Sequence, residues 1–183
     1  SNLTLDHKIY CLSDVPVPVT RIPLEHNWKG WWSKIELFRV ASFIEGRSLY
    51  VDLDTTIRKN IDWIGNAEHN FSMLRGFTQR KYPASGVMAW ENGQQLLPIY
   101  EAFKSDPEYH VARCVTPRLW GDQGFIADLS PLPIDMLQDR FPDQIVSYKF
   151  HCRDNGNVAP EGASIVCYHG EPKPWEAPLK EAA

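Results

Sequence analysis

Hydrophobic and polar positions along the chain alternate between a strand-like and a helix-like pattern. Short apolar runs rich in β-branched and aromatic residues, bounded by polar or glycine-containing turns, predict strands. Six runs fit this description: residues 7–12, 49–54, 71–75, 84–90, 144–149 and 164–169. A polar turn at residues 155–157 is expected to link the last two.

Apolar positions at three- and four-residue spacing predict helices between these strands. In residues 31–41, Trp31, Ile35 and Phe38 form one apolar face. Residues 94–103 repeat the pattern with Pro98 as an interior residue, and a short irregular helix is expected around residues 57–64.

This alternation predicts an α/β fold with a mixed, mainly parallel sheet flanked by helices. Ligands of open α/β sheets gather at the carboxyl ends of the strands. We therefore expect Asp52 and Asp54 at the carboxyl end of a central strand, beside a cleft. Residues 1–176 are predicted to form one domain and residues 177–183 a flexible tail.

Composition excludes several classes of protein. The chain has 183 residues, 43% of them hydrophobic, which is enough for one substantial core. Its net charge of −4 and lack of a basic stripe argue against a nucleic-acid binder that works by bulk electrostatics. No apolar run approaches the ~18 residues of a membrane span. The four cysteines show no CxxC spacing, which favours a reducing compartment: the cytoplasm, either free or peripherally at its membrane.

The pair Asp52 and Asp54 is the first candidate site. On an extended strand end, acids at i and i+2 point to the same side. Two carboxylates this close repel each other, and a hard divalent cation relieves that repulsion. The alternative is two solvated acids in a strand-to-loop turn.

Other residues carry both a functional and a structural interpretation. Lys34 lies in the first turn of a predicted helix, where it either directs its ammonium group at a phosphate or is an ordinary solvated lysine. Asp122 and Gln123 lie near a helix N-terminus, where they either cap the helix or face a cleft. Tryptophans cluster at Trp28, Trp31 and Trp32; core packing is the first interpretation, and a wall of a sugar or base site is the second.

Taken in order, five elements resemble a known family. They are a Ser-Lys helix at Ser33–Lys34, the Asp-x-Asp strand, a Ser-Gly-Val-Met strand at Ser85–Met88, the Asp122–Gln123 turn and a terminal His-Gly-x-x-Lys-Pro-Trp at His169–Trp175. The same order is seen in GT-A-fold glycosyltransferases related to family 8, the glycogenin and bacterial galactosyltransferase-like group. The resemblance implies a single GT-A-like (Rossmann-like) domain that moves a sugar from a nucleotide-diphosphate sugar, such as a UDP-sugar, to a carbohydrate acceptor with retention.

The resemblance also implies roles for individual residues. Asp52, Asp54 and His169 match the ligands of Mn²⁺ or Mg²⁺, and Asp122 and Gln123 match the acid and amide beside the donor sugar. The residues that match donor and phosphate binding are Lys34, Lys173, Gly170, Ser85 and Gly86.

Three departures from the family pattern change these expectations. Cys167 stands where the family has its histidine, and we expect His169 to serve instead because imidazole suits Mn²⁺ better than thiolate does. Ala84 replaces a common asparagine ahead of Ser-Gly. The family's first strand and helix, which bind the nucleotide base, have no counterpart, so either the sequence is a fragment or the base is held differently.

Two alternative functions remain open from the sequence. The string from Val51 to Thr56 also resembles the first motif of haloacid-dehalogenase-like phosphatases, in which the first aspartate is a nucleophile and the second a general acid. A non-catalytic domain that binds sugar nucleotides is the other alternative. Metal-dependent release of nucleoside diphosphate distinguishes a transferase from both.

Overall fold

The computed structural model describes residues 2–181 of the chain. Its strands are β1 (Tyr10–Ser13), β2 (Thr20–Pro23), β3 (Ser48–Val51), β4 (Thr55–Ile57), β5 (Phe71–Arg75), β6 (Pro83–Trp90), β7 (Asp135–Met136), β8 (Ile145–Ser147) and β9 (Ile165–Cys167). Its α-helices are α1 (Glu36–Ala41), α2 (Asp62–Asn66), α3 (Leu97–Ser105), α4 (Pro107–Arg113), α5 (Gly121–Leu129), α6 (Leu137–Arg140) and α7 (Tyr148–His151). Three 3₁₀ turns complete the elements: η1 (Gly30–Ile35), η2 (Gly93–Leu96) and η3 (Arg153–Asn155).

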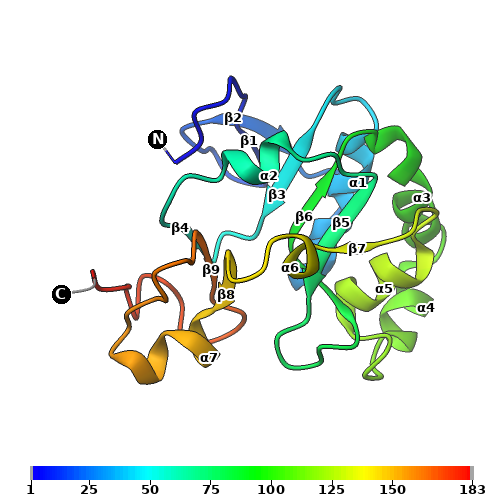
Figure 1. The fold of residues 1–183 in the computed structure, drawn as a ribbon. Coiled ribbons are helices and arrows are strands. Elements are labelled where there is room, and N and C mark those ends of the chain that lie inside the picture. Colours follow the sequence, from blue (N-terminus) through cyan, green and yellow to red (C-terminus); the bar gives the residue numbers. More distant parts are fainter. Residues whose placement is uncertain (1, 182–183) are drawn as a thin grey trace.

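The fold is α/β, with mixed sheets flanked by helices (Figure 1). The largest sheet has the order β3-β6-β5-β7, a second has the order β4-β9-β8, and β1 pairs with β2. The predicted class is therefore confirmed, but the sheet is not mainly parallel, because β6 runs antiparallel to both β3 and β5. Residues 76–82 link β5 to β6, and a connection this short permits a hairpin but not a parallel crossover.

The position predicted for the acidic strand needs a second correction. β3 is an edge strand of its sheet rather than a central one, since β6 is its only neighbour among the described strands. Asp52 follows β3 directly, whereas Asp54 immediately precedes β4, which belongs to the second sheet. The two acids are thus separated by a turn between sheets.

Two hydrophobic clusters position this turn. The larger one packs η1, α1, α3 and α5 against the four-stranded sheet around Ile35, Phe38, Phe71 and Phe125. Figure 1 shows α3, α4 and α5 gathered on the side of that sheet away from β8 and β9. A second cluster joins the two sheets, because Leu74 and Val87 pack with Ile145 and Ile165.

Several predicted elements differ in their details. The helix expected over residues 31–41 begins as a 3₁₀ turn and becomes α-helical at Glu36. Pro98 lies in the first turn of α3, where its missing N–H is tolerated, rather than in a helix interior. The strand expected over residues 144–149 ends at Ser147, whose hydroxyl caps α7. β8 and β9 run parallel, so residues 155–157 do not form a hairpin turn between them.

The start of the predicted flexible tail makes defined contacts. The Tyr168 hydroxyl donates to the Ala177 carbonyl at 2.8 Å, and the Lys180 N–H donates to the Asn157 carbonyl at 3.0 Å. Ala177 and Leu179 pack on the cluster around Tyr168. This part of the tail is therefore held against the domain, and the last two residues lie outside the described ones.

No helix in the described part of the chain has the length and apolarity that a membrane crossing requires.

Candidate functional site

A buried lysine gathers three polar side chains beyond the end of β3. Lys34 Nζ lies 2.9 Å from Asp52 Oδ1 and 3.1 Å from Asp122 Oδ2, and it donates to Ser85 Oγ at 3.0 Å. Ser85 Oγ in turn donates to Asp122 Oδ2 at 2.6 Å. We call Lys34, Asp52, Ser85 and Asp122 the lysine cluster. It unites residues from η1, β6, α5 and the end of β3.

Burial and charge set the protonation states in the lysine cluster. Burial disfavours the charged form of Lys34, but the carboxylates of Asp122 and Asp52 outweigh it and raise the pKa of Lys34, which stays an ammonium. Burial raises the pKa of Asp52, and the Lys34 ammonium opposes that rise. The positive charge near Asp52 therefore does not fully compensate for the burial of its carboxylate.

Tyr50 is a member of the site that sequence reasoning missed. Its hydroxyl donates to Asp52 Oδ1 at 2.5 Å, and Lys34 Nζ lies 5.6 Å from the centre of its ring. Burial and the Asp52 charge raise the pKa of Tyr50 well above its usual value, so it remains a donor. The available signal was its position two residues before Asp52, on the same face of the strand.

Asp54 is held by a separate lysine. Lys173 Nζ donates to Asp54 Oδ2 at 2.7 Å, and this hydrogen bond, which outweighs partial desolvation, raises the pKa of Lys173. The chain turns between the two acids, as the Thr55 N–H donates to the Asp52 carbonyl at 3.0 Å. The prediction that both acids extend from one face of a strand end is therefore wrong. Each acid instead reaches its own lysine.

His169 lies elsewhere than the predicted metal site requires. Its Nε2 is 2.6 Å from Ser147 Oγ, and its ring stacks on Phe77 at a centroid distance of 5.3 Å. Strand β9 ends at Cys167, so the alternation that was expected to bring residue 169 onto the face of residue 167 does not continue. Burial and the Lys149 ammonium lower the pKa of His169, and the Asp54 carboxylate only partly opposes them. The lowered pKa favours the neutral imidazole.

Cys167 occupies the family's histidine position as a buried thiol. It faces Thr55 across the β4–β9 pairing, and burial raises its pKa to about 12. In residues 2–181, no group of three or more histidine, cysteine, aspartate and glutamate side chains is arranged to hold a metal ion. The predicted trio of Asp52, Asp54 and His169 is thus not assembled in this structure.

The remaining predicted residues border these groups. A Cβ at Gly86 would lie 3.5 Å from both Asp52 Oδ2 and Leu74 Cδ1, so this glycine lies against the Asp52 carboxylate. Gly170 has a φ of +86°, and a Cβ there would lie 3.1 Å from Lys149 Nζ. Asp122 does not cap α5, whose N-cap is Trp120; Gln123 follows it in the first turn and is half-buried.

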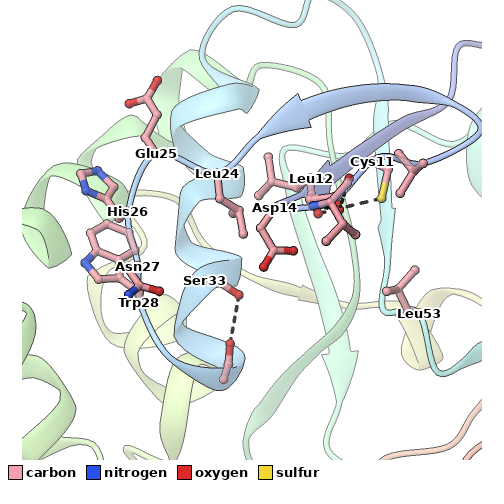
Figure 2. A pocket seen from close by; sticks show the side chains of 14 residues that line it. Cys11, Leu12, Asp14, Leu24, Glu25, His26, Asn27, Trp28, Ser33 and Leu53 are labelled. Atoms are coloured by element: carbon pink, nitrogen blue, oxygen red, sulfur yellow. Dashed lines mark hydrogen bonds between the residues drawn. The ribbon is translucent and has the colours of Figure 1, made fainter.

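A cavity of about 730 Å³ opens beside the turn between the two acids. Leu53, which is 89% exposed, forms one edge. The other lining residues come from β1 and the segment after it, from residues 24–28, and from η1. Figure 2 shows the Asp14 carboxylate extending into the space between Ser33 and Leu53. The cavity therefore combines apolar walls with an exposed acid, and Leu53, which lies between Asp52 and Asp54 in the sequence, is part of its lining.

Comparison with known proteins identifies the fold. No protein-family model matches the chain, and no curated protein matches it significantly. The crystal structure of the glycosyltransferase GlyE from Streptococcus pneumoniae TIGR4 matches with a TM-score of 0.56 and 16% sequence identity, over 85% of this chain and 42% of the GlyE chain. Its apo form matches with a TM-score of 0.53 at 16% identity, over 86% of this chain and 42% of the other. This chain has a glycosyltransferase fold and spans less than half the length of the GlyE chain.

Proposed function

We propose that this chain is a divalent-cation-dependent glycosyltransferase of the GT-A, family 8-like type, which moves a sugar from a nucleotide-diphosphate sugar to a saccharide acceptor with retention. The observation that carries the proposal is that two lysines hold three acids around Leu53, a residue that lines a cavity. Lys34 contacts Asp52 and Asp122, and Lys173 contacts Asp54. The likeness to GlyE supports this choice among functions of α/β folds.

The charges of the site suit a diphosphate group and a cation together. Three carboxylates face two ammonium groups, which leaves one net negative charge before any ligand binds. Added alone, a diphosphate would increase the negative charge, and a divalent cation offsets it. In this proposal Lys34 and Lys173 exchange part of their contact with the acids for contact with phosphate oxygens, as charge-assisted hydrogen bonds.

The donor groups present fit Mn²⁺ or Mg²⁺. Asp52 and Asp54 supply hard carboxylate oxygens, and His169 is held neutral, which is the form that coordinates. Asp52 and Asp54 would hold the ion, and His169 would join them only after leaving its contact with Ser147, whereas the Cys167 thiol, protonated at neutral pH, is a poor ligand. When bound, the cation supplies Lewis-acid stabilisation of the departing diphosphate.

The protein's own groups orient the reacting sugar in this proposal. Asp122 is fixed by Lys34 and Ser85 at one of its oxygens, so its carboxylate is directed without being free to rotate. Held in this way, it stabilises positive charge that develops on the sugar ring or orients the acceptor hydroxyl, and Gln123 supplies an adjacent amide. Tyr50 keeps Asp52 in place through its short hydrogen bond.

The nucleoside end of the donor is assigned to the cavity beside Leu53. Its volume of about 730 Å³ exceeds what a single base and ribose fill, and the Asp14 carboxylate accepts hydrogen bonds from ribose hydroxyls or a base N–H. Because Leu53 separates Asp52 from Asp54 in sequence, a diphosphate at the acids places an attached nucleoside next to this opening.

A panel of nucleotide sugars, with and without Mn²⁺, tests the function. We expect Mn²⁺-dependent release of nucleoside diphosphate from at least one donor, abolished in Asp52→Asn and Asp54→Asn. Asp154→Asn is the matched control, since that acid pairs with its neighbour Arg153 and its side chain is 86% exposed. Release of inorganic phosphate would favour the phosphatase alternative, and binding without release would favour the non-catalytic one.

The third metal ligand is tested separately. In the proposal, His169→Ala removes Mn²⁺-dependent turnover and Cys167→Ala retains most of it. Full activity in His169→Ala would exclude the imidazole from the site.

A further inference from the structure

Three tryptophans are exposed in this chain, and each is next to a charged residue of the site. Trp31 precedes Lys34 by three residues, Trp120 precedes Asp122 by two, and Trp175 follows Lys173 by two. Their exposed fractions are 55%, 51% and 69%. Exposed large aromatic rings gathered at one place are typical of binding surfaces.

Trp31 is the best defined of the three, because two separate elements hold it beside the lysine cluster. Along η1, residues three apart share a face, since a 3₁₀ helix has three residues per turn. The Trp31 ring and the Lys34 ammonium therefore project on the same side. On the other side, the ring packs against Gly121, the residue immediately before Asp122.

Gly121 is required for this packing for two reasons. Its φ of +57° is a conformation that favours glycine. In addition, a Cβ at residue 121 would lie 3.1 Å from Trp31 Nε1 and 3.3 Å from Cε2, which is tighter than ordinary contact. The backbone that leads into Asp122 thus fits the edge of an indole ring whose remaining surface is exposed.

Core packing does not account for Trp31. The adjacent Trp32 is the core residue: it is 8% exposed and stacks on Phe103 with a centroid distance of 4.9 Å and an interplanar angle of 14°. Trp31 is instead 55% exposed, and its ring contacts Gly121, the residue before Asp122.

We propose that the exposed face of Trp31 is a platform on which a sugar ring of the acceptor stacks, with its hydroxyl groups directed at Asp122. A pyranose has an apolar C–H face that packs on an aromatic ring and a rim of hydroxyls that donate to a carboxylate. Trp31 and Asp122, joined through Gly121, present these two complementary surfaces side by side. This inference rests on the proposed glycosyl transfer and names the place of its acceptor.

The charges of the site assign this platform to the acceptor rather than to the donor. The donor diphosphate is attracted to the ammonium groups of Lys34 and Lys173, and the Asp122 carboxylate repels it. The side of the site bounded by Trp31 and Asp122 is thus suited to a neutral ring. An acceptor hydroxyl placed there is next to Asp122, which the proposed reaction requires.

The test separates acceptor use from donor use. Nucleoside diphosphate release is measured with Mn²⁺ and an active nucleotide sugar, first without acceptor and then with methyl β-glycosides of glucose, galactose and N-acetylglucosamine. In Trp31→Ala we expect unchanged release without acceptor and an increase of about tenfold in the glycoside concentration that gives half-maximal stimulation. Trp31→Phe should recover part of this loss, since it retains an aromatic face.

Phe43→Ala is the matched control, because Phe43 is 62% exposed but lies at the end of α1, by a separate small hollow, and should leave both measurements unchanged. Equal loss of release with and without glycoside in Trp31→Ala would overturn the acceptor assignment. If the wild-type protein releases no nucleoside diphosphate, the proposed function fails, but saturation-transfer NMR with the same glycosides still tests the platform. Binding that Trp31→Ala abolishes would support it, and no binding to the wild-type protein would overturn it.

Discussion

Lys34 and Glu36 lie two residues apart in the sequence, and each is a buried charged side chain. The groups that contact them differ: backbone N–H groups contact Glu36, and side chains contact Lys34. Glu36 is fully buried, and its Oε2 and Oε1 accept the backbone N–H groups of Glu25 at 2.7 Å and His26 at 2.9 Å. Arg39 adds a hydrogen bond at 3.2 Å. The lysine cluster is instead held together by side chains alone, from Lys34, Asp52, Ser85 and Asp122.

In the proposed function, this difference separates a structural carboxylate from a functional one. Backbone amides are fixed by the fold, so Glu36 anchors the segment before η1 and has no reason to exchange partners. The contacts around Lys34 are made by side chains, and the cluster contains two carboxylates for one ammonium group, so a ligand can replace one of these contacts without disturbing the backbone. We therefore expect substitutions at Glu36 to affect stability and substitutions in the lysine cluster to affect activity.

Among the substitutions that test this comparison, Asp122→Asn should have the largest effect. We expect donor turnover to fall about 100-fold, because a preorganised charge at the reacting sugar is lost. The free energy of unfolding should change by less than about 1 kcal/mol, because the substitution keeps the side-chain shape and removes the negative charge that is in excess over Lys34. Steady-state kinetics and urea unfolding of the same preparation measure the two quantities. A stability loss without a loss of turnover would make Asp122 structural, like Glu36.

Glu36→Gln should give the opposite result. One of the two backbone N–H groups would face an amide NH₂ instead of an oxygen, so the free energy of unfolding should fall by about 1–3 kcal/mol. Turnover per folded molecule should stay at the wild-type value. Urea unfolding measures the first quantity, and activity corrected for the folded fraction measures the second. Lost turnover in fully folded Glu36→Gln would contradict the comparison.

Lys173→Met should have a smaller effect on the donor. The Lys173 side chain is 27% exposed, so its charge is partly screened, and we expect the half-saturating donor concentration to rise about tenfold. The dependence of donor binding on salt should also weaken. Lys104→Met is the control, because its ammonium lies over the Tyr100 ring and away from the acids. An unchanged salt dependence in Lys173→Met would remove Lys173 from phosphate binding.

The smallest effect concerns acid stability and uses a third buried polar group. His69 Nε2 lies 2.9 Å from the Ile64 carbonyl, and its Nδ1 lies 2.8 Å from Ser72 Oγ. Burial lowers the pKa of His69, so the folded state binds fewer protons than the unfolded state, in which the pKa is about 6.5. Its contribution to stability is complete above that value and is lost as the pH falls below it, by at most about 1.4 kcal/mol per pH unit.

Urea unfolding between pH 5 and pH 8 measures this slope. Because burial also lowers the pKa values of His110 and His169, the comparison must be made with His69→Gln, which should show a shallower slope. Identical slopes in the wild-type protein and His69→Gln would mean that His69 does not titrate differently in the two states.

The sequence predicted where elements end better than it predicted the turns between them and the pairing of the strands. Asp52 could be named because it follows an apolar run, and Lys34 and Asp122 because each lies near the start of a predicted helix, whereas Ser85 was named only through the family resemblance. The strand at Phe71–Arg75 was predicted with its observed bounds because it is an uninterrupted buried run.

Turns and pairing partners were not predictable in this way. The alternation of a strand was extended through Asp54 and through His169, but the chain turns after Asp52 and β9 ends at Cys167. Tyr50 was missed because its role depends on the burial of Asp52, which follows from long-range packing. The edge position of β3 depends on how strands far apart in sequence associate, and local periodicity does not record it.

The turn at Leu53 connects two separate sheets, so the distance between Asp52 and Asp54 depends on how these sheets are placed relative to each other. Asp52 is attached to the four-stranded sheet through β3, and Asp54 is attached to the three-stranded sheet through β4. The distance between the two carboxylates therefore reports the relative tilt of the sheets, which the cluster of Leu74, Val87, Ile145 and Ile165 fixes. We therefore expect that shortening a side chain inside that cluster changes the distance between the two carboxylates, although neither acid belongs to the cluster.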